Sequence, residues 1–175
     1  MDVYGLNAFT IPASPANQTA RFVAELRAQN ISHLASFYGF DEYNGNLSNI
    51  AAEFKPLKAA FPEVTTLTTA HVGMQFAGLA STPAPFTSAT MDMLGIDALV
   101  PQTNYLPPQS NISEVQHAGK QVWTYTSMQP YKPYAAWRLD NSLVDPRILF
   151  WQVRAFGFDG LLHWGLNMWP VKTPP

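Results

Sequence analysis

The sequence predicts an α/β fold with a parallel sheet, and two observations support this prediction. Segments with strand character alternate with segments with helix character along most of the 175 residues. The strand segments are apolar on both faces, as are the strands of a parallel sheet that is covered on both sides. Such a chain can close into a (β/α) barrel or form an open doubly wound sheet. No glycine-rich phosphate loop follows any strand segment, which counts against the nucleotide-binding version of the open sheet.

The expected elements follow one another in a regular order. Residues 1–17 combine a short strand at residues 2–9 with a loop broken by prolines. Apolar periodicity and helix-ending residues predict helices over residues 19–30, 47–61, 88–95, 113–119 and 145–157. The second of these helices is expected to kink or restart at Pro56. Apolar or β-branched runs predict strands over residues 32–40, 63–72, 96–102, 120–128 and 158–166. Four of these strands are clear, and residues 2–9 add a further one.

Composition excludes several classes of function. Only 13% of the residues are charged, and the net charge of -2 gives no reason to expect binding to nucleic acid or to an anionic membrane. No apolar run approaches the roughly 20 residues that a membrane helix needs. The absence of cysteine excludes disulfides, thiolate catalysis and cysteine-ligated zinc. The four scattered histidines have no metal-ligand spacing, so we expect neither a metal nor a cofactor.

Four sequons for N-glycosylation bear on the compartment, and they begin at Asn17, Asn30, Asn46 and Asn111. About one or two would arise by chance in such a sequence. The excess favours a secreted, secretory-pathway or lysosome-like protein, although unused coincidences would give the same pattern. The first residues, MDVYGLNAF, lack the basic start and long apolar segment of a signal peptide. We therefore expect any signal to lie on a part of the protein that this sequence does not include.

Polar and aromatic residues gather where the predicted strands end. These strand ends lie at residues 41–42, 69–71, 101–105, 125–127 and 163–167. In a barrel, the carboxyl ends of the strands carry the chemistry. A sugar suits such a site, because its apolar faces stack on Trp and Tyr while its hydroxyls bond to Asn, His and acids.

Two adjacent acids, Asp41 and Glu42, stand at the first of these strand ends. Within a strand their side chains would point to opposite faces, but the turn residues Asn44 and Gly45 indicate that the alternation relaxes here. Two carboxyls in a desolvated aromatic pocket supply a general acid beside an anion, as glycoside hydrolysis requires. A vicinal pair suits the substrate-assisted variant, in which the 2-acetamido oxygen of the sugar attacks the anomeric carbon. The alternative is that the pair is ordinary loop charge or a helix N-cap.

Three stretches together resemble the catalytic domain of glycoside hydrolase family 123, formerly domain of unknown function 4091. They are FYGFDEY at residues 37–43, FPEVTTLTTAHV at 61–72, and residues 121–169 with an RxLFW helix and a GxLxWGxNxW strand end. The resemblance runs from about residue 20 to the C-terminus and is loose over residues 73–118. It implies a (β/α)8 TIM barrel and a substrate-assisted, retaining β-N-acetylgalactosaminidase or β-N-acetylhexosaminidase. Asp41 would hold the acetamido group, and Glu42 would be the general acid and base.

Further residues are candidates for contact with the sugar. They are aromatic or polar residues near strand ends, namely Tyr38, His71, Trp123, Tyr125, Trp164 and Asn167. Trp123 and Trp164 could instead be core residues, and His71 could be a strand-end histidine with satisfied hydrogen bonds. Arg147 and Trp151 are expected to pack the last helix against its strand. The expected partner is a glycoside of an N-acetylated amino sugar.

The chain departs from the family in length. A full barrel needs about 250 residues and eight strands, so residues 1–175 are expected to form one partial barrel domain, its C-terminal half, with a proline-rich tail at 170–175. A half-barrel would expose strand edges and could self-associate. Three functions remain open: part of a glycosidase, a carbohydrate-binding pseudo-enzyme, or an inactive barrel fragment. The intact acidic pair favours the first, and the missing strands favour the last.

Overall fold

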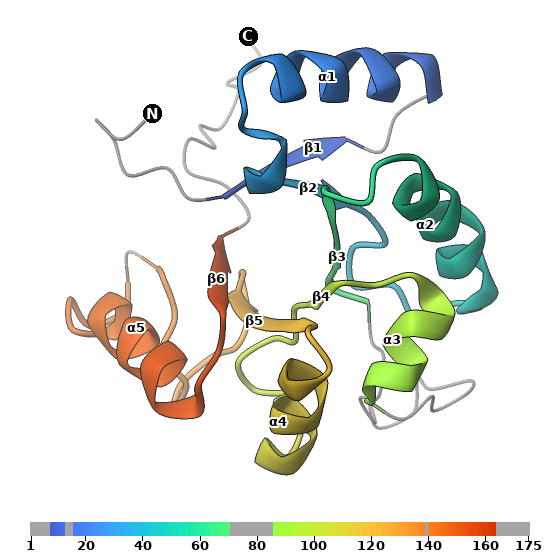
Figure 1. Ribbon diagram of the computed structural model, residues 1–175. Helices are drawn as coiled ribbons and strands as arrows, with labels where there is room; N and C mark the ends of the chain where they lie inside the picture. Colours follow the sequence, from blue (N-terminus) through green and yellow to red (C-terminus); the bar gives the residue numbers. More distant parts are fainter. Residues whose placement is uncertain (1–7, 13–15, 71–85, 139, 164–175) are drawn as a thin grey trace, which may run out of the picture.

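The computed structural model describes residues 8–12, 16–70, 86–138 and 140–163, and this part of the chain contains one curled sheet of six parallel strands (Figure 1). The strands are β1 (Phe9–Pro12), β2 (Ala35–Tyr38), β3 (Thr65–Thr68), β4 (Ala98–Leu99), β5 (Gln121–Thr126) and β6 (Gly160–His163). The helices are α1 (Ala16–Ala28), α2 (Ser48–Ala60), α3 (Ser88–Leu94), α4 (Gln109–His117) and α5 (Asp145–Phe156), with a 3-10 turn at Ser32–Leu34.

The order of the strands distinguishes between the two predicted closures. Each strand pairs in parallel with the next one in the chain, so the order in space is β1-β2-β3-β4-β5-β6. A doubly wound sheet reverses its strand order at a switch point and carries helices on both faces. Here the order never reverses, and the helices surround the outside of the curl (Figure 1). The described fold is a parallel half-barrel of the TIM type, with six strands of the expected eight.

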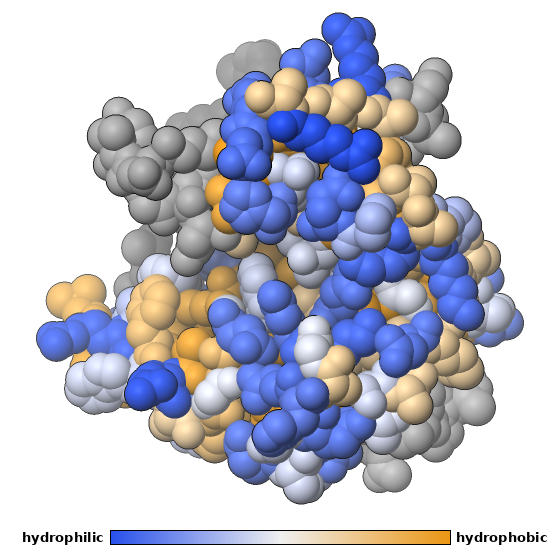
Figure 2. All heavy atoms as spheres, viewed as in Figure 1, coloured by the Kyte–Doolittle hydropathy of each residue, from blue (hydrophilic) through white to orange (hydrophobic). Residues whose placement is uncertain are grey.

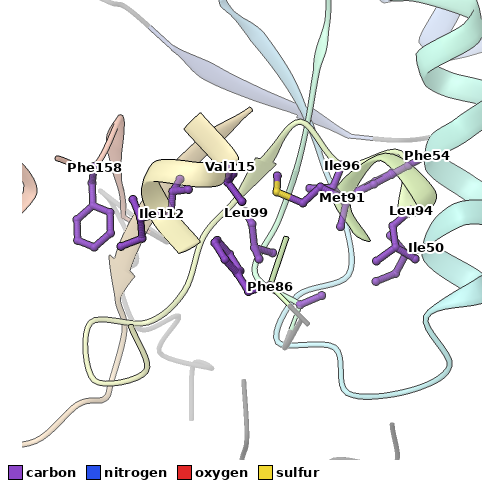
Figure 3. Packing of buried hydrophobic residues seen from close by; sticks show 12 residues of the cluster. Ile50, Phe54, Phe86, Met91, Leu94, Ile96, Leu99, Ile112, Val115 and Phe158 are labelled. Carbon is purple, nitrogen blue, oxygen red and sulfur yellow. The ribbon is translucent and has the colours of Figure 1, made fainter. Parts of the chain in front are cut away.

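Residues alternate between the outer and the inner face of this sheet. On the outer face, Leu99 and Val122 join a buried core with residues of α2, α3 and α4, among them Phe54 and Met91 (Figure 3). A second outer core packs α1 against β1 and β2. The inner face carries its own cluster, which consists of Leu67, Ala98, Val100 and Tyr125 together with the half-buried Tyr38, Trp123 and Leu162. Because the side-chain period of a strand is two, Val122 and Trp123 face opposite sides of β5.

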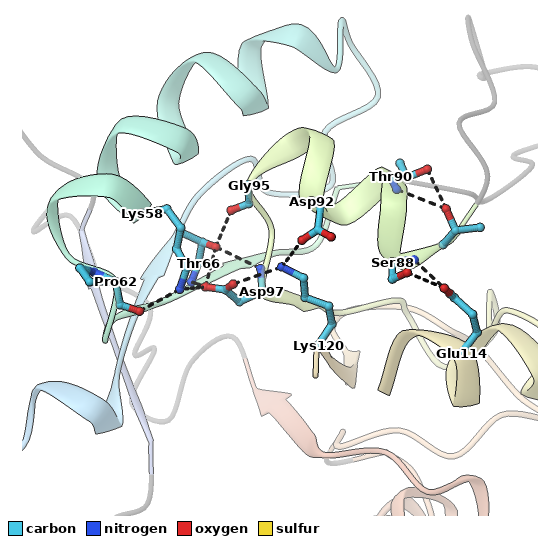
Figure 4. A network of polar contacts seen from close by, with 11 residues as sticks. Lys58, Pro62, Thr66, Ser88, Thr90, Asp92, Gly95, Asp97, Glu114 and Lys120 are labelled. Carbon is cyan, nitrogen blue, oxygen red and sulfur yellow. Dashed lines mark hydrogen bonds and ion pairs between the residues drawn. The ribbon is translucent and has the colours of Figure 1, made fainter. Parts of the chain in front are cut away.

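A polar network lies where β3 and β4 begin (Figure 4). Asp97, directly before β4, accepts hydrogen bonds from the backbone N–H and the hydroxyl of Thr66 at 3.0 and 3.1 Å. Its carboxylate also pairs with Lys58 at 2.5 Å and with Lys120 at 3.5 Å. This end of a barrel lies opposite the carboxyl ends of the strands, where catalytic sites lie, so the network stabilises the fold.

The structure corrects several element predictions. The first described strand lies at Phe9–Pro12 and overlaps the predicted strand at Phe9; residues 2–7 of that prediction lie outside the described part. Six strands are described, whereas four were clear from the sequence and a further one was expected at residues 2–9. One continuous helix, α2, runs through Pro56. Helix α4 begins at Gln109, four residues earlier than predicted, because the extended backbone of Pro108 already leads into it.

The prediction that Arg147 and Trp151 pack α5 against its strand is wrong. Leu149 is the buried residue of α5, whereas Arg147 is exposed and Trp151 is 63% exposed. Figure 2 shows hydrophobic residues gathering on this side of the molecule, near α5 and β6. In the described part of the chain, no helix combines the length and the apolar character that a membrane crossing requires.

Candidate active site

A hollow of about 880 Å³ opens at the carboxyl ends of the strands. Its lining comes from Thr10 of β1, from the ends of β2, β3, β5 and β6, and from the loops that follow β2, β4 and β5. Asp41 and Glu42 both belong to this lining. The hollow therefore lies at the strand ends and gathers side chains that are far apart in the sequence, which makes it the candidate site.

The turn after β2 explains how two neighbouring residues reach one hollow. The N–H of Gly39 continues the ladder to the carbonyl of Leu67 at 3.2 Å, and regular pairing then stops. Phe40 and Glu42 take left-handed backbone conformations, with φ of 58° and 44°. Such conformations at non-glycine residues break the alternation of side chains, and each costs on the order of 1–3 kcal/mol. The expected relaxation at Asp41 and Glu42 is confirmed.

Contacts around Phe40 hold this strained turn. Its carbonyl accepts a hydrogen bond from the Thr68 hydroxyl at 3.1 Å. Its ring packs edge-on against Phe54 of α2 and Tyr43, with centroid distances of 5.5 and 5.2 Å. Aromatic pairs of this kind contribute about 0.5–1.5 kcal/mol each beyond burial, which is enough to offset much of the strain.

Asp41 is held through one of its two oxygens. Its Oδ1 accepts hydrogen bonds from the Tyr38 hydroxyl at 2.5 Å and from the Thr69 hydroxyl at 3.0 Å. Thr69 is only 1% exposed, and its oxygen accepts the backbone N–H of Glu42 at 2.9 Å. A hydroxyl has one proton, so Thr69 donates to Asp41 while it accepts from Glu42. This single side chain connects the two acids.

Glu42 is also held through one oxygen. The hydroxyl of Tyr125, on the inner face of β5, donates to its Oε1 at 2.6 Å. Among the described residues, nothing forms a hydrogen bond with Oδ2 of Asp41 or with Oε2 of Glu42. Each acid therefore keeps one oxygen available to a ligand in the hollow. Both acids are exposed, so the desolvated pocket predicted from the sequence is absent from the described part of the chain.

The two tyrosines are permanent donors to these acids. Burial raises the pKa of Tyr38, and its hydrogen bond to the carboxylate of Asp41 raises it further. Burial raises the pKa of Tyr125 in the same way, with the hydrogen bond to Glu42 as the second cause. Neither hydroxyl loses its proton near neutral pH, so both hold the acids throughout the physiological range.

The predicted site residues fall into three groups. Tyr38, Asp41, Glu42 and Tyr125 come together around the hollow. Trp123 does not line it: the ring lies one layer deeper on the inner face, where its Nε1 donates to Gln121 at 2.9 Å. A Cβ at Gly160 would lie only 2.5 Å from this ring, so the glycine makes room for it. Three further predicted residues lie outside the described part, namely His71, Trp164 and Asn167.

Other lining residues were not among the candidate contact residues, although Thr69, Gln102 and His163 fall in the strand-end ranges predicted from the sequence. Thr69 and Gln102 lie at the ends of β3 and β4, and Tyr131 and His163 lie beyond β5 and at the end of β6. Thr69 could have been found from the sequence, since it follows Leu67 by two residues and therefore shares its inner face. Tyr131 lies in a loop, where no periodicity indicates its direction. No group of three or more acidic or histidine side chains in the described ranges could hold a metal ion.

A comparison with protein-family models finds a match that covers most of the chain. The family model described as glycoside hydrolase 123, catalytic domain, matches residues 19–174. The match includes both acids and all strands from β2 to β6. No curated protein matches the chain.

Proposed function

The chain belongs to glycoside hydrolase family 123, a family of carbohydrate-cleaving enzymes, and we propose that its reaction is the substrate-assisted, retaining hydrolysis of β-N-acetylgalactosaminides or related β-N-acetylhexosaminides. The observation that carries the proposal is the arrangement of Asp41 and Glu42. Each acid is fixed by hydrogen bonds to one oxygen and presents the other to the same hollow. Adjacent acids with separate supports suit two separate roles on one sugar.

Asp41 acts on the acetamido group in this proposal. Its Oδ2 accepts the acetamido N–H, which turns the amide oxygen toward the anomeric carbon and stabilises the positive charge that develops on the amide during attack. The hydroxyls of Tyr38 and Thr69 keep the carboxylate in place. Orientation of a nucleophile that belongs to the substrate converts the first step into an intramolecular attack.

Glu42 acts on the departing and entering oxygens. Its Oε2 carries the proton that moves to the glycosidic oxygen as the bond to the anomeric carbon breaks. The resulting carboxylate then takes a proton from water, and this water attacks the anomeric carbon from the side that the leaving group has vacated. The bond between the anomeric carbon and the acetamido oxygen, formed in the first step, breaks and restores the amide. Two displacements at the same carbon retain its configuration. Tyr125 holds Oε1 and so keeps Oε2 pointing into the hollow.

Aryl N-acetyl-β-galactosaminides test this proposal. Glu42→Gln should lower turnover by about 10²–10⁴-fold for poor leaving groups and by much less for leaving groups that need no proton. Asp41→Asn should lower turnover for all N-acetyl substrates alike. Glu25→Gln, an exposed acid on α1 outside the hollow, is the matched control. Wild-type rates in both site variants would refute the assignment, and saturable sugar binding without turnover would favour the carbohydrate-binding alternative.

A secretory location remains part of the proposal, and the structure separates the sequons. Asn30 is exposed in the turn after α1, with a left-handed φ of 56°. Asn111 lies in the first turn of α4, and its side-chain amide donates to the carbonyl of Phe86 at 3.0 Å. A glycan on Asn111 would replace one of the two Nδ2 hydrogens and crowd the Phe86 carbonyl, which lies 3.0 Å from this nitrogen. We therefore expect Asn30 and not Asn111 to carry a glycan when the chain is secreted from a eukaryotic host, as glycopeptide mass measurement would show.

A further inference from the structure

The loop that follows β5 brings a large aromatic side chain to the edge of the hollow. Tyr131 lines the hollow together with Met128 and Gln129, and it comes from a different part of the chain than the two acids. The Tyr131 side chain is 61% exposed. A large aromatic ring left open at the edge of a polar hollow is a surface for a ligand that is itself partly apolar.

Arg138 fixes the direction of this ring. Its guanidinium carbon lies over the ring at 4.8 Å from the centroid. The same guanidinium donates from Nη1 to the carbonyl of Met128 at 3.0 Å, which ties the two ends of the loop together. A guanidinium over an aromatic face is attractive, and here it covers one face of the ring. The exposed surface of the Tyr131 ring is therefore its other face and its edge.

The hollow extends beyond the acidic pair. A sugar held between Asp41 and Glu42 leaves open the side of the hollow that the loop after β5 lines. The space that remains extends to the residues of the loop after β5, and Tyr131 is the most exposed ring among them.

We propose that Tyr131 forms a second sugar-binding subsite, which stacks a pyranose ring of a carbohydrate chain whose terminal N-acetylated sugar occupies the acidic pair. This inference rests on the proposed function and names its substrate class, an oligosaccharide or polysaccharide. The apolar C–H face of a pyranose matches the open face of the tyrosine, and its hydroxyls remain in water. Arg138 keeps the ring in place and so lowers the entropy that the sugar must overcome.

Other exposed aromatic residues do not share this position. Trp137 packs edge-on against Phe150 at 5.8 Å and lies 4.9 Å from the ring of His163. Trp151 on α5 is as exposed as Tyr131, at 63%, but it does not line the hollow. Trp151 is therefore the matched control for loss of an exposed aromatic ring.

Binding measurements test the subsite without turnover. The ligands are N-acetylgalactosamine and a tetrasaccharide that ends in β-linked N-acetylgalactosamine, titrated by calorimetry or ligand-observed NMR against the full chain. Every protein carries Glu42→Gln, so that the proposed hydrolysis does not consume the tetrasaccharide. Tyr131→Ala should weaken the tetrasaccharide about tenfold, the factor that corresponds to about 1.4 kcal/mol, and should change monosaccharide binding by less than twofold. Tyr131→Trp should keep tetrasaccharide affinity, and Trp151→Ala should leave both affinities unchanged.

Three results would overturn the proposal. One is equal tetrasaccharide affinity with and without Tyr131→Ala, and another is an equal loss for both ligands. The third is that Tyr131→Ala weakens the binding of an octyl glycoside as much as that of the tetrasaccharide. The ring of Tyr131 would then bind an apolar aglycone and not a second sugar. The proposed function can fail separately: hydrolysis unaffected by changes at Asp41 and Glu42 would refute it even if the tetrasaccharide depends on Tyr131.

Discussion

Thr69→Val is the sharpest test of how the two acids work together. The Thr69 hydroxyl donates to Asp41 at 3.0 Å and accepts the backbone N–H of Glu42 at 2.9 Å. Valine has nearly the same shape and removes these two hydrogen bonds together with the 3.1 Å contact between the Thr69 and Tyr38 hydroxyls. Because the side chain is 1% exposed, water has no access to replace the missing hydroxyl. The substitution therefore frees Asp41 on one side and leaves the turn at Glu42 without its anchor.

The expected loss follows from these two hydrogen bonds. A bond to a charged group contributes about 1.5–3 kcal/mol, and a neutral one about 1 kcal/mol. Tyr38 still holds Asp41 at 2.5 Å, so the combined effect is taken as about 3 kcal/mol. Each 1.36 kcal/mol is a factor of ten in rate, which gives a fall in kcat of roughly 10²-fold.

The assay is hydrolysis of a series of aryl N-acetyl-β-galactosaminides whose leaving groups differ in acidity. The part of the loss that Thr69 transmits through Asp41 should appear in kcat and should be equal across the series, unlike the loss in Glu42→Gln. A part that grows for poorer leaving groups would come from the turn at Glu42. Thr69→Ser, which keeps the hydroxyl, should restore most of the rate, and thermal unfolding of both variants controls for a loss of folding. Wild-type kcat in a folded Thr69→Val protein would refute the reasoning, as would a serine variant no better than valine.

Two further predictions concern stability. Burial raises the pKa of Tyr38 and Tyr125, so the unfolded chain loses these protons near the ordinary value of about 10 while the folded protein keeps them. The contribution of the two tyrosines to the free energy of unfolding should therefore be constant below about pH 9 and fall above about pH 10. Denaturant titrations of the wild type and of a double Phe variant check this, and equal pH slopes would contradict it. Asp97→Asn should lower the free energy of unfolding by about 2 kcal/mol, since the Asp97 carboxylate is only 19% exposed and is shared by two lysines and a threonine. Asp92→Asn, at 68% exposure, should cost less than about 0.5 kcal/mol, and equal losses would show that burial does not decide the effect.

The fold was predictable where the sequence carries a period or a clear end. Helix α5, with Pro146 in its first turn, was predicted within one residue of its bounds because its end is marked by Gly157, which has a left-handed φ of 68°. The end of strand β1 was predicted three residues too early, because the four residues that end in Pro12 carry no pattern of their own and only pairing with β2 makes them a strand. The choice between barrel and open sheet depends on the order of the strands, which is a property of contacts far apart in the sequence.

The site was predictable in its residue types and only partly in its contacts. The adjacent acids and Tyr125 stood out because they end apolar strands. Sequence alone could not tell that Tyr125, 83 positions after Glu42, donates to it. Trp123 differs from Tyr125 by two residues and shares its face, yet lies one layer deeper, out of the hollow. A strand pattern gives the face of a residue, whereas its depth in the barrel depends on the register between strands.

The exposure of Asp41 and Glu42 changes how such a site would obtain its catalytic power. In a dry pocket, the protein alone would strengthen the interactions of the acids, because charges interact more strongly at low dielectric constant. In the described part of the chain, both acids are exposed to water. The hydroxyls of Tyr38, Thr69 and Tyr125 therefore help by fixing the positions of the acids and not by removing water from them. The substrate must then exclude the water itself. A carbohydrate chain that reaches Tyr131 would cover more of the hollow than a single sugar, so the second subsite would raise turnover as well as affinity.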